Sequence, residues 1–139
     1  MNTGHTPLIY LVDDDQDEHF LVQSIFDGQA NSYDVRSFYD GTDLITQLTH
    51  RLDHRFPDLI LLDLHMPILS GYDVLRMLKG DPQWRGIPVI INSASTDRSA
   101  RKRCMALGCS VFLDKSSYYL TDDDVLTSFM TFPRTTHEN

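Results

Sequence analysis

The chain has 139 residues, of which 41% are apolar and 23% are charged, and its formal net charge is −8. This length fits one globular domain, and no apolar run approaches the roughly 20 residues that a membrane-spanning helix needs. The negative charge argues against direct nucleic-acid binding, because such binding normally needs a basic face that neutralises phosphates.

The first seven residues, MNTGHTP, carry neither the basic nor the apolar segment of a secretory signal. The only two cysteines, Cys104 and Cys109, do not form a disulfide framework. We therefore predict a cytoplasmic protein without a membrane partner. Residues 1–7 are interpreted as a leader, 8–132 as one domain and 133–139 as a C-terminal tail.

The first predicted element is LIYLV at 8–12, a continuous apolar run typical of a strand that is buried on both faces. Residues 19–26 have apolar positions at helical spacing, and Gly28 is a plausible stop. The alternating segment 33–38 predicts a strand nearer an edge of the sheet. Residues 41–52 predict a helix, which Thr42 or Asp43 could cap.

The second half of the chain repeats this order. DLILLD at 58–63 predicts a strand, and 72–80 predicts a helix that closes at Gly80. A strand follows at 89–94. The helix predicted at 95–108 has Ser95, Thr96 or Asp97 as its cap and ends at Gly108. The last elements are a strand at 110–115 and a helix at 120–132.

Five repeats of strand and helix indicate a doubly wound α/β fold with a parallel sheet and right-handed crossovers. In such sheets, ligand sites lie beyond the carboxyl ends of the strands, where the strand order reverses. Polar residues stand at the ends of four predicted strands, and these are Asp13, Asp14, Asp15, Asp63, Ser93 and Lys115. If these strands are neighbours, their polar ends share one edge.

Several carboxylates that are held close together repel one another unless a cation neutralises them. Hard oxygen ligands suit Mg²⁺, and a metal beside a lysine can offset the charge of a phosphoryl group. One carboxylate could then act as a nucleophile and become an acyl phosphate. The chain has neither glycine-rich phosphate loop, GxxxxGK[ST] or GxGxxG, so it is not an evident nucleotide binder.

Four motifs, LVDDD, LILLDLHMP, PVIINSA and FLDK, appear in order on this alternation. With them, the chain from Leu8 to Met130 resembles the receiver domain of two-component response regulators, in particular the single-domain, chemotaxis-regulator-like kind. The resemblance implies a flavodoxin-like five-stranded sheet with the strand order 2-1-3-4-5.

The resemblance also implies roles for individual residues. Asp63 would be the phosphoacceptor. Asp13, Asp14, Asp63 and the backbone carbonyl of His65 would hold Mg²⁺, with Mn²⁺ as a possible substitute. Ser93 and Lys115 would bind the phosphoryl oxygens, and Ser93 and Phe112 would form the conformational switch.

Three departures from the family pattern accompany these roles. Ser116 follows Lys115 where the family usually has proline, so we expect a strained loop or a trans rearrangement there. Phe112 stands where the family often has tyrosine. His65 and Ser95 occupy the two variable positions that tune hydrolysis of the acyl phosphate in this family.

The implied function is a phosphorelay step. A histidine kinase or a phosphotransfer protein would phosphorylate Asp63, and the face around the fourth helix, fifth strand and fifth helix would then contact an unknown protein or a second copy. The chain would turn over no independent substrate, so it would not be an enzyme in that sense. About nine residues follow Met130, so we expect the output to be a protein–protein contact.

Two other functions stay open. One is a receiver-like scaffold that is never phosphorylated. The other is a small Mg²⁺-dependent aspartyl phosphatase, although such enzymes usually place a second aspartate where His65 stands.

Several features have ordinary explanations beside functional ones. Asp15 could simply cap the first helix. His50 and His54 are four residues apart on a predicted helix, a spacing that can bind zinc, but no third ligand is evident. The basic segment RSARKR at 98–103 is either a solvated helix face or a docking surface.

Overall fold

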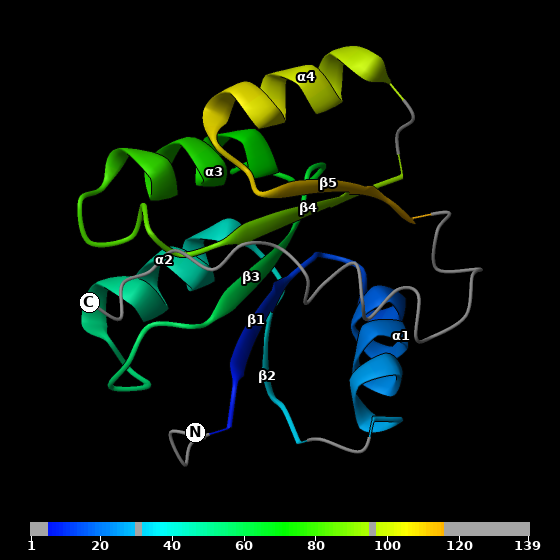
Figure 1. Ribbon diagram of the computed structural model, residues 1–139, viewed down its shortest axis with the longest axis vertical. Coiled ribbons are helices and arrows are strands. Elements are labelled where there is room, and N and C mark those ends of the chain that lie inside the picture. Colours follow the sequence, from blue (N-terminus) through cyan, green and yellow to red (C-terminus); the bar gives the residue numbers. More distant parts are fainter. Residues whose placement is uncertain (1–5, 30–31, 95–96, 116–139) are drawn as a thin grey trace.

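The computed structural model describes residues 6–29, 32–94 and 97–115. Its five parallel strands lie in the order β2-β1-β3-β4-β5 (Figure 1), which confirms the fold and the strand order that the resemblance implied. The elements in chain order are β1 (Leu8–Val12), α1 (Gln16–Asp27), β2 (Asp34–Phe38), α2 (Gly41–His50), β3 (Leu59–Asp63), α3 (Gly71–Gly80), β4 (Val89–Ser93), α4 (Arg98–Leu107) and β5 (Val111–Asp114). The predicted helix at 120–132, the tail and Ser116 lie outside the described residues, as does Ser95.

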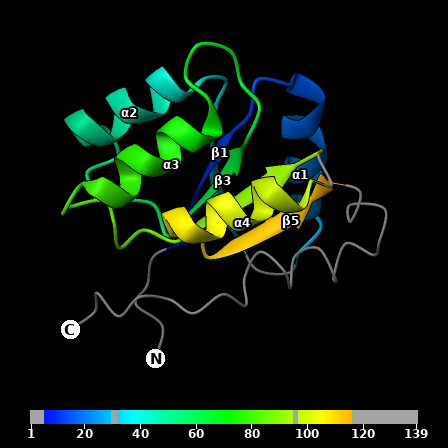
Figure 2. The same ribbon diagram turned by 90° about the horizontal axis from the view of Figure 1, so that it is seen from above.

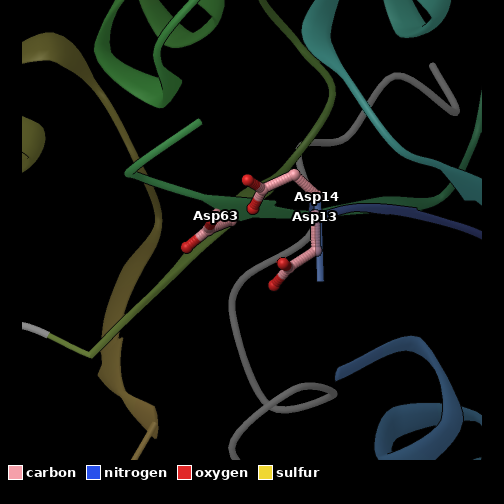
Figure 3. Close-up of side chains that lie close together, drawn as sticks. All are labelled: Asp13, Asp14 and Asp63. Carbon is pink, nitrogen blue, oxygen red and sulfur yellow. The ribbon is translucent and has the colours of Figure 1, made fainter. Parts of the chain in front are cut away.

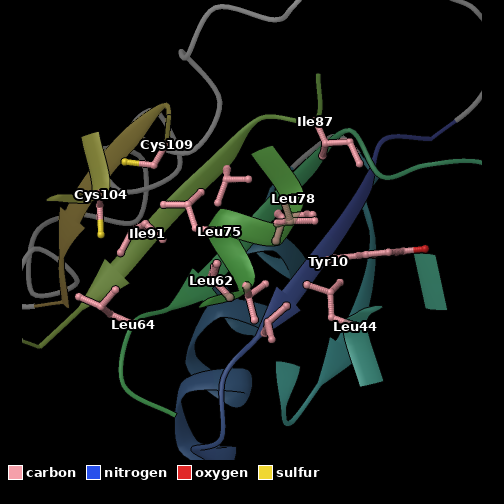
Figure 4. Packing of buried hydrophobic residues seen from close by; sticks show 14 of the residues in the cluster. Tyr10, Leu44, Leu62, Leu64, Leu75, Leu78, Ile87, Ile91, Cys104 and Cys109 are labelled. Carbon is pink, nitrogen blue, oxygen red and sulfur yellow. The ribbon is translucent and has the colours of Figure 1, made fainter. Parts of the chain in front are cut away.

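Helices cover both faces of the sheet. Neighbouring residues of each strand point to opposite faces, so each strand contributes side chains to both cores. Tyr10 of β1 packs in the larger core beneath α2, α3 and α4 (Figure 4), together with Leu62 and Leu75. Ile9 and Leu11 pack on the other face, against α1. Figure 2 shows α1 on the side of the sheet opposite α2 and α3. None of the helices in the described part is long and apolar enough to span a bilayer.

The apolar runs of the sequence became the centre of the sheet. All five residues of β1, β3 and β4 are buried, whereas β2 is mostly exposed at the edge, as its alternating pattern predicted. Each fully buried Leu, Ile or Val stabilises the fold by about 1.5–3 kcal/mol relative to an exposed one. The polar residues that follow these strands are therefore attached to the buried centre of the sheet.

Helix ends follow the predicted caps in α1 and α4. Asp15 caps α1 by accepting a hydrogen bond from the Asp17 backbone N–H, and Asp97 caps α4 in the same way through Ser99. Gly108 ends α4 at φ +107°, a conformation that favours glycine.

The predicted cap of α2 is wrong. Asp40, and neither Thr42 nor Asp43, caps this helix, and its carboxylate accepts a hydrogen bond from the backbone N–H of Asp43. The helix begins at Gly41, so Thr42 and Asp43 already lie inside the first turn. Asp43 there donates its backbone N–H, which is the role of the third helical residue.

The helical spacing proposed for His50 and His54 is also wrong. The helix α2 ends at His50, and Arg51 follows in the left-handed conformation at φ +50°. The two histidines therefore do not share a helix, and the spacing no longer supports a zinc site.

Candidate functional site

Acidic side chains meet at the carboxyl edge of the sheet. Asp13 and Asp14 follow β1, and Asp63 is the last residue of β3, the strand beside β1. One carboxylate oxygen from each of the three lies within 4.8 Å of the others, and Figure 3 shows the three side chains close together. This convergence was predicted from the sequence, because neighbouring parallel strands end at the same edge of a sheet.

Lys115 joins this cluster from the end of β5. Its Nζ lies 2.9 Å from Oδ2 of Asp13 and 3.3 Å from Oδ1 of Asp63. Burial opposes the charged form of this lysine, but the hydrogen bond to Asp13 and the charges of both carboxylates outweigh it, so the pKa of Lys115 is raised. The ammonium therefore stays charged and bridges the two buried acids.

Asp13 makes hydrogen bonds through both its main chain and its side chain. Its backbone N–H donates to the carbonyl of Phe38 at 3.0 Å, and its Oδ1 accepts from the backbone N–H of Asp15 at 2.9 Å. Its own carbonyl accepts a hydrogen bond from Nε2 of His19 at 2.7 Å. Lys115 contacts the other carboxylate oxygen, Oδ2, so both the main chain and the side chain of Asp13 are held by hydrogen bonds.

Asp63 is a buried acid in an unfavourable electrostatic position. It is 6% exposed. Burial, followed by the charge of Asp13, raises its pKa to about 6, although Lys115 acts in the opposite direction; Asp14 adds to the rise. Lys115 therefore relieves only part of the repulsion among the three acids.

Asp14 differs from its neighbours because it is exposed. Within the described residues, no hydrogen bond holds its carboxylate. It thus presents free oxygen atoms to the solvent side of the cluster. Three carboxylates of this kind form an oxygen-only donor set that fits Mg²⁺ or Mn²⁺, and a divalent cation would relieve the remaining repulsion at Asp63.

Comparison with known proteins places this arrangement in a family. The family model of the response regulator receiver domain matches residues 9–123. The chain belongs to this family. It is therefore a receiver domain of two-component signalling.

The curated relatives of this receiver domain include response regulators. The response regulator PleD of Caulobacter vibrioides is 38% identical over 86 residues, which are 62% of this chain and 18% of PleD. The polar-differentiation response regulator DivK of Brucella ovis is 29% identical over 113 residues, which are 79% of this chain and 85% of DivK. The chain thus spans less than a fifth of the length of PleD.

Solved structures show the same fold. The Mn²⁺-bound form of the response regulator Rcp1 superimposes with a TM-score of 0.81 at 23% identity, covering 93% of this chain and 99% of Rcp1. The chemotaxis protein CheY4 of Vibrio cholerae gives 0.76 at 17% identity, covering 93% of this chain and all of CheY4. These likenesses support the receiver fold of this chain.

Two of the remaining predicted residues of the receiver site lie on neighbouring strands, and the third follows β3. Ser93 ends β4, is fully buried and is in register with Asp114 of β5. Phe112 is 8% exposed and is in register with Ile91, so its ring belongs to the core beneath α4. His65 is exposed two residues after Asp63. The roles of Ser93, Phe112 and His65 in phosphoryl binding, switching and cation binding stay predictions, because position alone does not test them.

Three buried polar groups near the site were not predicted from the sequence. Oε2 of Glu18, Nδ1 of His19 and Oδ1 of Asn92 are buried without a hydrogen-bond partner among the described residues. Burial raises the pKa of Glu18, Lys115 opposes the rise and Asp13 contributes to it. Asn92 lies beside Asp63 in the sheet register. Only Glu18 had a signal in the sequence, as the end of the acidic run that begins at Asp13.

Gly71 is required where α3 approaches this site. Its backbone N–H donates to the carbonyl of Leu64 at 2.9 Å. A Cβ at Gly71 would lie 2.3 Å from the carbonyl oxygen of Asp63 and 2.6 Å from Cα of Leu64. Only glycine therefore lets the helix start this close to the strand end that carries Asp63.

Proposed function

We propose that Asp63 accepts a phosphoryl group from the phosphohistidine of a histidine kinase or a histidine phosphotransfer protein. The observation that carries this proposal is the cluster of three carboxylates within 4.8 Å, with Lys115 between two of them. A purely structural set of charges would pair each acid with a cation. Among the described residues, one lysine contacts two of these three acids, which leaves the site short of positive charge.

In the proposed reaction, an oxygen of Asp63 forms a bond to phosphorus while the bond between phosphorus and the donor imidazole nitrogen breaks. The product is an acyl phosphate on Asp63. Lys115 leaves its bridging position between the acids far enough to pair with a phosphoryl oxygen, and the Ser93 hydroxyl donates to another.

A divalent cation belongs to this proposal. Asp13, Asp14, Asp63 and the backbone carbonyl of His65 would hold Mg²⁺, or Mn²⁺ in its place. The cation would offset the negative charge that the phosphoryl group brings to the cluster. The Mn²⁺-bound structure of Rcp1 and the oxygen-only donor set of this chain support the assignment.

Phosphorylation would be read out through a change of surface. Movement of Ser93 toward the phosphoryl group would free space that the ring of Phe112 can enter, and this coupling would shift an equilibrium between two conformations. The surface around α4, β5 and the predicted fifth helix would then contact an unknown protein or a second copy. The domain would turn over no independent substrate.

The test uses beryllofluoride, a mimic of the phosphoryl group, with Mg²⁺. A ligand at ten times its dissociation constant should add roughly 1.4 kcal/mol to the free energy of unfolding of the wild-type protein. Asp63→Asn should abolish this gain, and Asp34→Asn, the same change at an exposed site of β2, should leave it intact.

The alternatives make different predictions for the same samples. A scaffold that is never phosphorylated should neither bind beryllofluoride nor take up phosphate from acetyl phosphate, and that result would refute the proposal. A phosphatase should release phosphate from a small phosphoester over many turnovers. Stoichiometric labelling of Asp63 without such turnover would support a receiver.

A further inference from the structure

His19 occupies a buried position on α1 that the proposed reaction does not use. It is 5% exposed, and its Nε2 lies 2.7 Å from the backbone carbonyl oxygen of Asp13. A carbonyl oxygen can only accept a hydrogen bond, so Nε2 carries the proton and the neutral ring has its acceptor at Nδ1. The ring is thus committed to one tautomer by the main chain of the acidic cluster.

A second contact fixes the plane of this ring. Tyr39, the residue after β2, stacks on His19 with a centroid distance of 4.2 Å and an interplanar angle of 35°. Its neighbour Phe38 accepts the hydrogen bond from the backbone N–H of Asp13. The main chain of Asp13 therefore has two hydrogen bonds. Its N–H donates to Phe38 at the end of β2, and its carbonyl accepts from the ring of His19, on which Tyr39 packs.

The carbonyl that His19 binds is part of the peptide unit between Asp13 and Asp14. A peptide unit is planar, so fixing its oxygen also fixes the N–H and Cα of Asp14. The carboxylate of Asp14 is exposed and has no hydrogen bond within the described residues. Among the described contacts, only those of the backbone restrict where Asp14 lies, whereas the Asp13 carboxylate is itself held by Asp15 and Lys115.

We propose that His19 is a positioning residue of the cation site. By orienting the peptide between Asp13 and Asp14, it places the backbone of Asp14 so that its carboxylate, which makes no hydrogen bond within the described residues, can meet the oxygen atoms of Asp13 and Asp63. The inference rests on the proposed function, because it assumes that these carboxylates bind a divalent cation. Its prediction is specific: loss of the hydrogen bond weakens cation binding even when the protein remains folded.

The test is calorimetric titration of metal-stripped protein with Mn²⁺. His19→Leu removes the donor but keeps an apolar side chain, and it should weaken Mn²⁺ binding about threefold to tenfold, the range that one hydrogen bond contributes. His19→Gln can place an amide N–H near the same carbonyl, so its dissociation constant should stay within about twofold of the wild-type value. Glutamine carries no charge, so this rescue would exclude an electrostatic effect of the histidine.

A matched control separates positioning from stability. Val22 lies on the same helix, is fully buried and packs in the core against the sheet. Val22→Ala should lower the melting temperature in the presence of a chelator and leave the Mn²⁺ dissociation constant unchanged. A role of His19 that is only structural predicts the same behaviour for His19→Leu.

Three outcomes overturn the inference. One is wild-type affinity in His19→Leu, and another is equal weakening in His19→Leu and His19→Gln. If His19→Leu does not fold, Tyr39→Ala decides the question, because it uncovers the ring and should weaken Mn²⁺ binding at least about twofold; unchanged binding refutes the inference. Absence of Mn²⁺ binding in the wild-type protein would instead overturn the proposed function, and the positioning role with it.

Discussion

The buried charge of Asp63 should make the metal-free protein less stable than it could be. A rise of the pKa of this carboxyl from 3.8 to about 6 corresponds to about 3 kcal/mol of unfavourable electrostatic free energy in the folded state. The side chain is 6% exposed, so solvent screens little of it. Asp63→Asn removes the charge and nearly preserves the shape.

We therefore expect Asp63→Asn to raise the free energy of unfolding by about 1–3 kcal/mol near neutral pH, which is about 3–9 °C in melting temperature for a chain of this size. The lower bound allows for imperfect hydrogen bonding of the new amide. Urea unfolding with a chelator present measures this difference. Asp34→Asn at an exposed position of β2 is the matched control and should change the free energy by less than about 0.5 kcal/mol.

The pH dependence supplies a second check on the sign. Because the folded-state pKa of Asp63 is higher than the unfolded value, the folded protein binds more protons between pH 3.8 and about 6. The free energy of unfolding of the wild-type protein should fall as pH rises through this window, while the variant lacks this term. The advantage of Asp63→Asn should therefore shrink as the pH is lowered toward about 4.5. A variant that is equal to or less stable than the wild type at neutral pH would refute the reasoning.

Three further predictions concern the pH dependence of cation binding, the packing around two glycines and the burial of the cysteines. Mn²⁺ affinity should be constant above about pH 7 and fall up to tenfold per pH unit below about 6, because protons then compete for Asp63; calorimetry at several pH values measures this, and a flat profile would contradict it. Gly71→Ala should cost about 1–3 kcal/mol, because its Cβ would overlap the backbone of Asp63 and Leu64. Gly80→Ala, where nothing lies within 4 Å, should stabilise the protein by up to about 1 kcal/mol, and equal urea midpoints for the two variants would be inconsistent with the packing. Cys104 and Cys109 are buried, and burial raises the pKa of Cys109 to about 11, so both thiols should react with a disulfide reagent only after unfolding; rapid labelling of the native protein would contradict this.

The sequence was informative wherever one residue type has one dominant physical role. The run Leu8–Val12 is typical of a buried strand, so the acids that follow it were predicted to stand at a strand end, and the structure confirms this. Asp15 and Asp97 cap their helices through a side-chain oxygen that reaches a backbone N–H two residues later. Such contacts are local, so a short stretch of sequence determines them.

The predictions for the two ends of α2 were wrong because several neighbouring residues could each have begun or ended the helix. Asp40, Thr42 and Asp43 are all good caps, and the end of β2 at Phe38 decides which one lies in the extended backbone before the helix. The left-handed Arg51 ends α2 before the second of the two histidines. Neither result follows from helical periodicity, because periodicity describes the middle of a helix better than its ends.

Long-range polar contacts away from the strand ends could not be predicted from the sequence. Tyr10 looked like one more apolar strand residue, yet its hydroxyl donates to Asp53 at 2.6 Å, and Gln47 and Arg36 donate to the same carboxylate. His19 binds a main-chain carbonyl, and every residue has one, so side-chain patterns could not indicate the partner. The candidate site could be predicted as a set of charged strand ends, but the groups that orient those charges could not.

The variants at Asp63 and His19 test two different reasons why the proposed site would bind a cation. The charge of Asp63 stores electrostatic free energy in the folded state, and a cation that relieves the repulsion recovers it. Asp63→Asn should therefore gain stability and lose cation binding together. His19 stores no such energy, because its hydrogen bond stabilises both the fold and the orientation of Asp14. His19→Leu should thus lose stability and cation affinity together. If both variants bind the cation more weakly, but Asp63→Asn is more stable and His19→Leu less stable than the wild type, then repulsion and preorganisation contribute separately to the site.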